Sequence, residues 1–187
     1  MSRLAEVYGN WVDHSEHEPA WTSGSGYLLA ARLLLTAAHV VCPGGTALAD
    51  VRVRAQSGEL AAARVVWHRH EGDVDVALVE ITDPAWVEPR WRQPVRWGRF
   101  VTRRPGQRCE AIGFPSVVAT PQRRDSHHAE GRISPGSLIK AGLHAMEVDN
   151  PPAPPTDGRS WWAGMSGAAV LADGLLVAVV TKDPAGG

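Results

Sequence analysis

The chain has 187 residues, of which 44% are hydrophobic and 21% are charged, and its formal net charge is -1. This length and composition fit one globular domain or two small packed halves, and they argue against a disordered chain or a fibrous repeat. A nearly neutral chain offers no basic surface to nucleic acid or to an anionic membrane, so neither is expected as a partner.

No apolar run reaches the ~18 residues that a membrane-spanning helix needs, and the first residues lack the basic and apolar regions of a secretory signal. We therefore expect the protein in the cytoplasm. Cys42 and Cys109 are the only cysteines, too few for a disulfide framework, and we expect both to be reduced there. Seventeen arginines against two lysines suggest a GC-rich bacterial genome.

Short apolar or alternating runs, separated by Gly, Pro and polar clusters, predict an all-β barrel or sandwich. A short helix is expected within residues 1–23. A first group of strands is predicted at residues 26–30, 33–37, 51–55, 62–67 and 76–81. A second group is predicted at residues 108–113, 129–134, 143–149, 168–172 and 175–181. Residues rich in Pro, Arg and Trp predict a linker at 82–107, and long loops are predicted at 115–128 and 150–160.

One serine lies between two glycines directly before an apolar run, in the sequence GMSGAAV that contains Ser166. The glycines allow a sharp turn, and they leave the N–H groups of Gly164 and Ser166 free to point at one spot before the hydroxyl. Such a spot would hold the oxygen of a tetrahedral intermediate. The tetrapeptide alone is more often an ordinary glycine-rich loop entering a strand.

A serine hydroxyl is a weak nucleophile unless a nearby base removes its proton. Among eight histidines, His39 stands out because it closes the apolar segment LLLTAAHVV, although alone it fits a buried histidine bonded to backbone. A carboxylate would hold such a base in the correct tautomer. Asp73 and Asp75 precede an apolar strand, and we choose Asp75 because it enters the strand itself, although a lone aspartate there is usually a turn residue.

Taken together, the segments LTAAHV, DVDVAL and GMSGAAV resemble the trypsin-like serine peptidases of the chymotrypsin fold, whose triad has the chain order His, Asp, Ser. The segments EAIGFP and GLLVAVV resemble strands of bacterial members. The resemblance implies an all-β fold of two antiparallel β-barrels with the active site in the cleft between them. It places the N-terminal barrel at about 24–81, the linker at 82–107 and the C-terminal barrel at about 108–187, where no last strand is found, so we expect that barrel to be truncated.

The resemblance also implies roles for individual residues. His39 would be the general base, Asp75 would orient it, and Ser166 would attack the substrate. The N–H groups of Gly164 and Ser166 would form the oxyanion hole. Met165 stands where digestive members have an aspartate that pairs with a newly cut N-terminus, so activation by such a cut is not expected.

Five residues are candidates for the substrate pocket by the same resemblance. Ser160 stands at the base of the primary specificity pocket, where it gives no anion to recruit Lys or Arg. Trp161 and Trp162 would line that pocket, or pack against the Pro-rich loop as large rings often do. Thr181 and Lys182 fall where relatives lay an edge against the substrate backbone.

These expectations describe a serine endopeptidase acting through an acyl-enzyme on a protein or peptide, as the effector domain of a larger bacterial signalling or defence protein. Further domains of the polypeptide or a partner regulator would control it. A catalytically silent or latent binding module of the same fold is the alternative. No cofactor is expected, and no metal, because the His68/His70 and His127/His128 pairs lack the spacing of a zinc signature.

Overall fold

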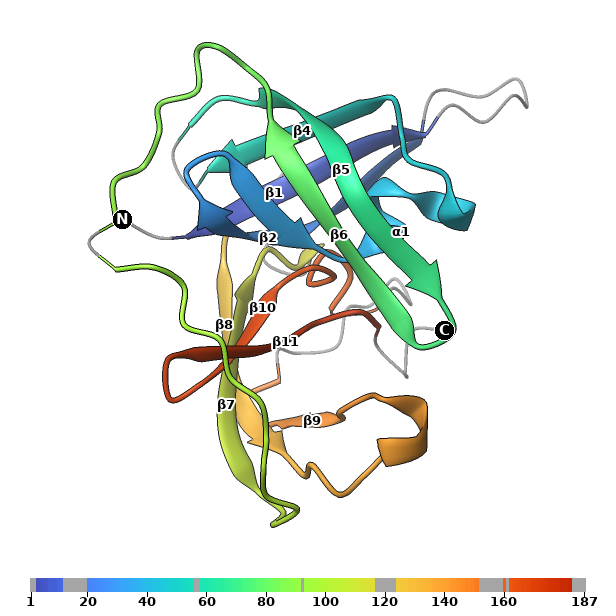
Figure 1. Cartoon of the computed structure of the whole chain (residues 1–187), viewed down its shortest axis with the longest axis vertical. Coiled ribbons are helices and arrows are strands. Elements are labelled where there is room, and N and C mark those ends of the chain that lie inside the picture. Colours follow the sequence, from blue (N-terminus) through green and yellow to red (C-terminus); the bar gives the residue numbers. More distant parts are fainter. Residues whose placement is uncertain are drawn as a thin grey trace.

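The computed structural model describes residues 3–11, 20–55, 58–91, 93–116, 124–151, 160 and 162–182. They form two antiparallel β halves, a barrel and an open sheet that lie one above the other in Figure 1. The all-β fold of two antiparallel halves is therefore confirmed. Each predicted strand overlaps an observed one. No helix within the described residues is long and apolar enough to cross a membrane.

The N-terminal half is a closed barrel with the strand order β1-β2-β3-β6-β5-β4. Its strands are β1 (Leu4–Trp11), β2 (Ala20–Ala30), β3 (Leu33–Thr36), β4 (Asp50–Ala55), β5 (Ala61–Glu71) and β6 (Val74–Ile81). Alternate apolar side chains point inward because successive side chains of a strand face opposite sides. Val51 and Val53 of β4 illustrate this, since both are buried while Arg52 between them is not. Between β3 and β4 lie a single helical turn, α1 (Ala38–Val41), and a short 3-10 turn (Pro43–Gly45).

Strand β1 corrects the expectation of a helix near the start of the chain, for the described part of that segment. It pairs with both β2 and β4 and so closes the barrel. Ala5 and Val7 are apolar and fully buried, whereas Glu6 between them is a buried carboxylate paired with Arg54 of β4. This alternation has the period of a strand, and the pairing available on both sides outweighs a local helix preference.

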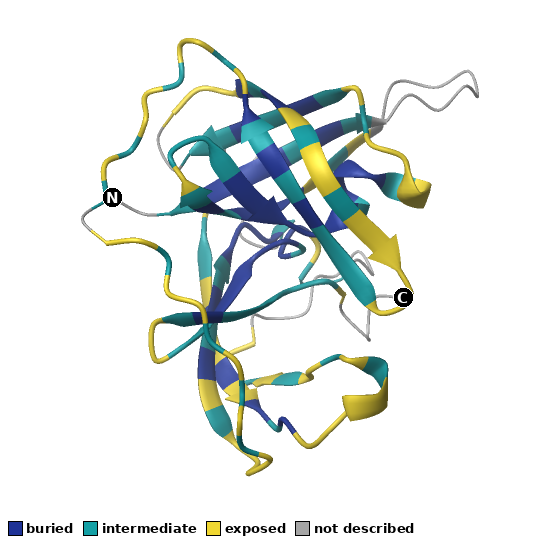
Figure 2. Ribbon diagram, in the orientation of Figure 1, coloured by how far each residue is buried: buried dark blue, intermediate teal, exposed yellow. Residues whose placement is uncertain are grey.

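The C-terminal half is a five-stranded sheet with the order β11-β10-β7-β8-β9, which is open among the described residues. Its strands are β7 (Gln107–Gly113), β8 (His127–Ile133), β9 (Met146–Val148), β10 (Ala169–Ala172) and β11 (Leu175–Val179), with a 3-10 turn (Ile139–Ala141) before β9. Buried residues gather inside the barrel and where the sheet meets it (Figure 2). Cys42 and Cys109 are buried free thiols, one in each half, and burial raises the pKa of each to about 11.

The connection between the halves is extended and is hydrogen-bonded to both. Trp86 donates its indole N–H to the carbonyl of Ala31 in the barrel, at 2.9 Å. Further along, Leu176 of β11 donates to the Arg96 carbonyl at 2.8 Å and accepts from the N–H of Gly98 at 2.9 Å. These contacts help to fix the sheet relative to the barrel, and with it any site at their junction.

Candidate active site

His39 and Asp75 form a close pair at the edge of the barrel. His39 Nδ1 lies 2.5 Å from Asp75 Oδ2, and the backbone N–H of His39 donates to Asp75 Oδ1 at 2.9 Å. One residue therefore engages both carboxylate oxygens, which fixes the imidazole in position and orientation. In this arrangement Nε2, the other ring nitrogen, points away from the carboxylate.

Helix α1 presents His39 because the rest of the turn is apolar. Ala38, Val40 and Val41 are buried, whereas the His39 side chain is 36% exposed. The Thr22 hydroxyl donates to the Val40 carbonyl at 2.6 Å, which ties the turn to β2. The short helix is thus held by three buried side chains and a hydrogen bond, and it leaves its single polar side chain at the surface of the barrel.

Asp75 carries a lowered pKa. Burial alone would raise the pKa of this carboxyl, but hydrogen bonds from the His39 ring and backbone N–H, with the nearby charges of His39 and His70, lower it below its usual value. His70 lies directly opposite Asp75 in the β5–β6 ladder. The carboxylate is therefore ionised at neutral pH, and it can stabilise a positive charge on the imidazole.

Ser166 lies in a tight turn, residues 162–167, which we call the Ser166 loop. Gly164 has φ of 95° and Gly167 has φ of 90°, positive values that residues other than glycine rarely adopt. Between them Met165 is 2% exposed and packs in the apolar core of the sheet. The buried Met165 side chain therefore anchors the loop in the core of the sheet, while the two glycines make the bend.

The Ser166 loop belongs to the sheet half but is docked on the barrel beside α1. The N–H of Ser25 in β2 donates to the Ser166 carbonyl at 2.7 Å. A Cβ added at Gly24 would meet both the Ser166 carbonyl oxygen and the Val40 side chain at 2.7 Å, so only glycine fits there. The nucleophile candidate is thus held next to the turn that carries His39. Both residues are described, and no hydrogen bond joins the Ser166 hydroxyl to the His39 ring. In unliganded enzymes such bonds are often long.

Two N–H groups of the Ser166 loop have no acceptor among the described residues, those of Gly164 and Ser166. Their neighbours do: Met165 donates to the Trp162 carbonyl and Gly167 to the Val180 carbonyl, both at 2.8 Å. With respect to the described residues, this leaves two N–H donors at the bend available to a ligand.

The orientation of the Gly164 N–H is set from outside the loop. The N–H of Ser116 donates to the Ala163 carbonyl at 2.7 Å. In a trans peptide the C=O and the following N–H point in opposite directions, so the Gly164 N–H faces away from Ser116.

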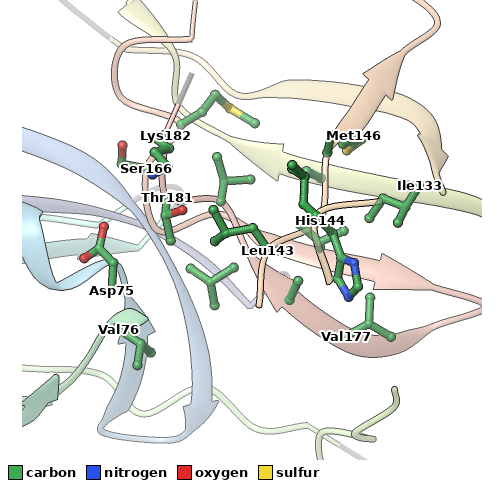
Figure 3. A pocket seen from close by; sticks show the side chains of 18 of the residues that line it. Asp75, Val76, Ile133, Leu143, His144, Met146, Ser166, Val177, Thr181 and Lys182 are labelled. Carbon is green, nitrogen blue, oxygen red and sulfur yellow. The ribbon is translucent and has the colours of Figure 1, made fainter. Parts of the chain in front are cut away.

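A cavity of about 790 Å³ lies beside Ser166 (Figure 3). Figure 3 shows Asp75, Ser166 and Thr181 at one end. Its other end is lined by apolar side chains of the sheet, among them Ile133 and Val177. Residues of β9 and β11, the two edge strands of the sheet among the described residues, both line the cavity.

The predicted pocket residues have different places. Trp162, Thr181 and Lys182 line the cavity. Ser160 is not among its lining residues: its hydroxyl accepts from the Trp162 N–H at 3.1 Å and its carbonyl from a later N–H of the same turn, at 3.2 Å. Trp161 lies outside the described residues. No group of three or more His, Cys, Asp or Glu in the described ranges could hold a metal ion.

Ser25 and Ser116 hold the Ser166 loop, and neither was expected from the sequence. A weak signal for the first exists in the run Ser-Gly-Ser-Gly at residues 23–26, since small residues allow close approach of another segment. Ser116 acts through its backbone N–H, which any residue but proline supplies, so its side chain carries no signal.

Most of the chain matches the model of a known family. The family model described as a trypsin-like peptidase domain matches residues 24–179. The chain belongs to this family. A search of curated proteins found no match. Among solved structures, the peptidase domain is similar to the Rv3671c protease from M. tuberculosis in its active form, with 16% identity and a TM-score of 0.60 over 96% of this chain and 70% of that one. At this identity the likeness shows the fold.

The lowered pKa of Asp75 predicts a pH-dependent contribution to stability. Its pairing with His39 stabilises the fold above the usual aspartate value of 3.8, and this contribution is lost as the pH falls through the lowered pKa. We expect the free energy of unfolding of the parent to exceed that of Asp75→Asn at neutral pH, with the difference shrinking in acid. Denaturant titrations across this pH range measure it.

Asp73→Asn is the matched control, because Asp73 lies two residues away in the β5–β6 turn and has no such bond to His39. Its unfolding free energy should follow that of the parent. A difference between the parent and Asp75→Asn that stays constant from neutral to acid pH would contradict the assignment of this pair.

Proposed function

We propose that this peptidase domain is a serine endopeptidase that uses His39, Asp75 and Ser166 as a triad and passes through an acyl-enzyme. The observation that carries the proposal is the double contact of Asp75 with His39, beside a loop in which the N–H groups of Gly164 and Ser166 have no acceptor among the described residues. Membership of the trypsin-like family supports it, because three polar residues occur in the family's order.

In the proposed acylation step, His39 Nε2 takes the proton of the Ser166 hydroxyl as Oγ bonds to the substrate carbonyl carbon. The carbonyl oxygen becomes an oxyanion, which accepts hydrogen bonds from the N–H groups of Gly164 and Ser166. His39 then gives its proton to the leaving nitrogen, and the C–N bond breaks. In the second step water attacks the acyl carbon with His39 again as base, which releases the acid and restores the serine.

Asp75 acts through His39 in both steps. Its carboxylate holds the Nδ1 proton and stabilises the imidazolium that forms when Nε2 is protonated. The oxyanion donors contribute separately, and removing one such donor typically costs about 3 kcal/mol of transition-state stabilisation. A large share of the rate thus depends on the conformation of the Ser166 loop rather than on the three side chains alone.

The substrate that fits the proposal is a protein or peptide, bound along the cavity edge formed by Thr181 and Lys182. Ser160 offers no negative charge for a basic side chain, so specificity for Lys or Arg is not part of the proposal. We propose further that the domain is a cytoplasmic effector of a larger bacterial signalling or defence protein, controlled by other domains or by a partner regulator.

A latent or catalytically silent binding module of the same fold is the second candidate. Two observations favour it: His39 and Ser166, both described, form no hydrogen bond with each other, and the adjacent sheet is open among the described residues. In a latent enzyme, closing that sheet or binding a peptide would bring the hydroxyl and the imidazole together.

Labelling with a fluorophosphonate probe tests the nucleophile. The probe phosphonylates only an activated serine, so we expect the parent to be labelled and Ser166→Ala and His39→Ala to remain unlabelled. In-gel fluorescence followed by mapping of the modified peptide measures this. A parent that stays unlabelled, or a label on another serine, would overturn the proposed function for this chain.

Replacing the orienting carboxylate tests the triad. Asp75→Asn should lower kcat on a peptide substrate by on the order of 10³- to 10⁴-fold, because the amide favours the wrong tautomer of His39. Asp73→Asn changes a neighbouring charge only and should change kcat little. Equal losses in the two variants, measured by steady-state kinetics, would show that the wrong aspartate has been chosen.

A further inference from the structure

We propose that Ser25 is a positioning residue for the oxyanion hole: its buried hydroxyl sets the conformation of the Ser166 loop from the opposite barrel. The inference rests on the proposed function and adds to it a residue outside the triad. Ser25 lies on β2 in the N-terminal half and is fully buried.

Ser25 makes hydrogen bonds to both ends of the segment that carries the candidate donors. Its Oγ donates to the Gly164 carbonyl at 2.7 Å and accepts from the N–H of Phe114 at 2.9 Å. Its own backbone N–H donates to the Ser166 carbonyl at 2.7 Å. The hydroxyl therefore links three parts of the chain, the barrel, the end of β7 and the Ser166 loop.

These bonds complete a series that fixes successive peptide groups of the loop. The Ala163 carbonyl is held by Ser116, the Gly164 carbonyl by the Ser25 hydroxyl, and the Ser166 carbonyl by the Ser25 N–H. The Met165 carbonyl accepts from Ala168 at 2.8 Å. The two candidate donors share peptide groups with the Ala163 and Met165 carbonyls, so they face away from Ser116 and Ala168. The Ser25 hydroxyl fixes the Gly164–Met165 peptide group that lies between these two donor groups.

The Ser25 hydroxyl supplies the one contact in this series that comes from a side chain. It acts where the backbone is most free, because Gly164 has no Cβ to oppose rotation of the adjacent peptide groups. A bond to the Gly164 carbonyl selects one of the conformations that glycine permits. Without it, the Gly164–Met165 peptide group is free to rotate, which displaces the donor N–H groups on either side of it relative to the oxyanion.

A purely structural role would have a different signature. Loss of a buried hydroxyl leaves the Gly164 carbonyl and the Phe114 N–H without their partner, which lowers stability wherever in the fold it happens. A positioning role lowers kcat in the molecules that remain folded, and it leaves substrate binding nearly unchanged, because the donors act on the transition state more than on the ground state.

The test compares Ser25→Ala with Thr36→Val. Thr36 is also fully buried and donates its hydroxyl to a backbone carbonyl, that of Ser25, at 2.7 Å, so the two variants lose similar bonds. Assays run well below the melting temperatures of both. For Ser25→Ala we expect kcat to fall roughly 10- to 100-fold with KM within about threefold, and inhibition by a peptide aldehyde to weaken in proportion.

The two variants should differ in kcat by at least tenfold, on the order expected for a misplaced donor. Similar kcat values in Ser25→Ala and Thr36→Val, or a loss confined to KM or to melting temperature, would overturn the inference. Should Ser25→Ala not fold, Ser25→Cys replaces it: a thiol is a weak donor, so kcat should fall at unchanged KM, and an unchanged kcat would overturn the inference. A parent without Ser166-dependent hydrolysis would instead refute the proposed function.

Discussion

The structure depends on one contact between its two halves, the docking of the Ser166 loop on strand β2. The loop is built by the sheet half, where Met165 is buried, but its backbone is bonded to Ser25 of the barrel. His39 and Asp75 belong to the barrel alone. Without this contact only the hydrogen bonds of the connecting segment would relate Ser166 to His39 and Asp75. A displacement of about 1 Å between reacting groups can cost 10²-fold in rate.

Glycine is what allows such close docking. Gly24 leaves room for the Ser166 carbonyl, and Gly167 would meet the backbone of Ser25 if it carried a Cβ. Electrostatics adds to this geometry on the barrel side, where the lowered pKa of Asp75 keeps a negative charge behind the imidazole. The proposed chemistry thus uses a charge held in one half and backbone dipoles held in the other. The Ser25 contacts keep the charge and the dipoles at a fixed relative position.

Sequence patterns predicted much of this molecule because they are local. Alternating apolar residues indicated the strands from β2 to β11, and the flanks of His39, Asp75 and Ser166 indicated the candidate triad. Strand β1 was missed because its short alternating run also allows a helix, and only pairing with β2 and β4 decides between them. Ser25 was missed because its partner Gly164 is 139 positions away, a distance at which no periodicity connects two residues.

A structure of the protein with a peptide aldehyde bound tests the central claim most directly. The aldehyde carbon should bond to Ser166 Oγ, and the resulting oxygen should lie about 2.7–3.1 Å from the N–H groups of Gly164 and Ser166. The Ser25 hydroxyl should still donate to the Gly164 carbonyl. An adduct whose oxygen is turned away from both N–H groups, with the Ser25 bond intact, would contradict the account.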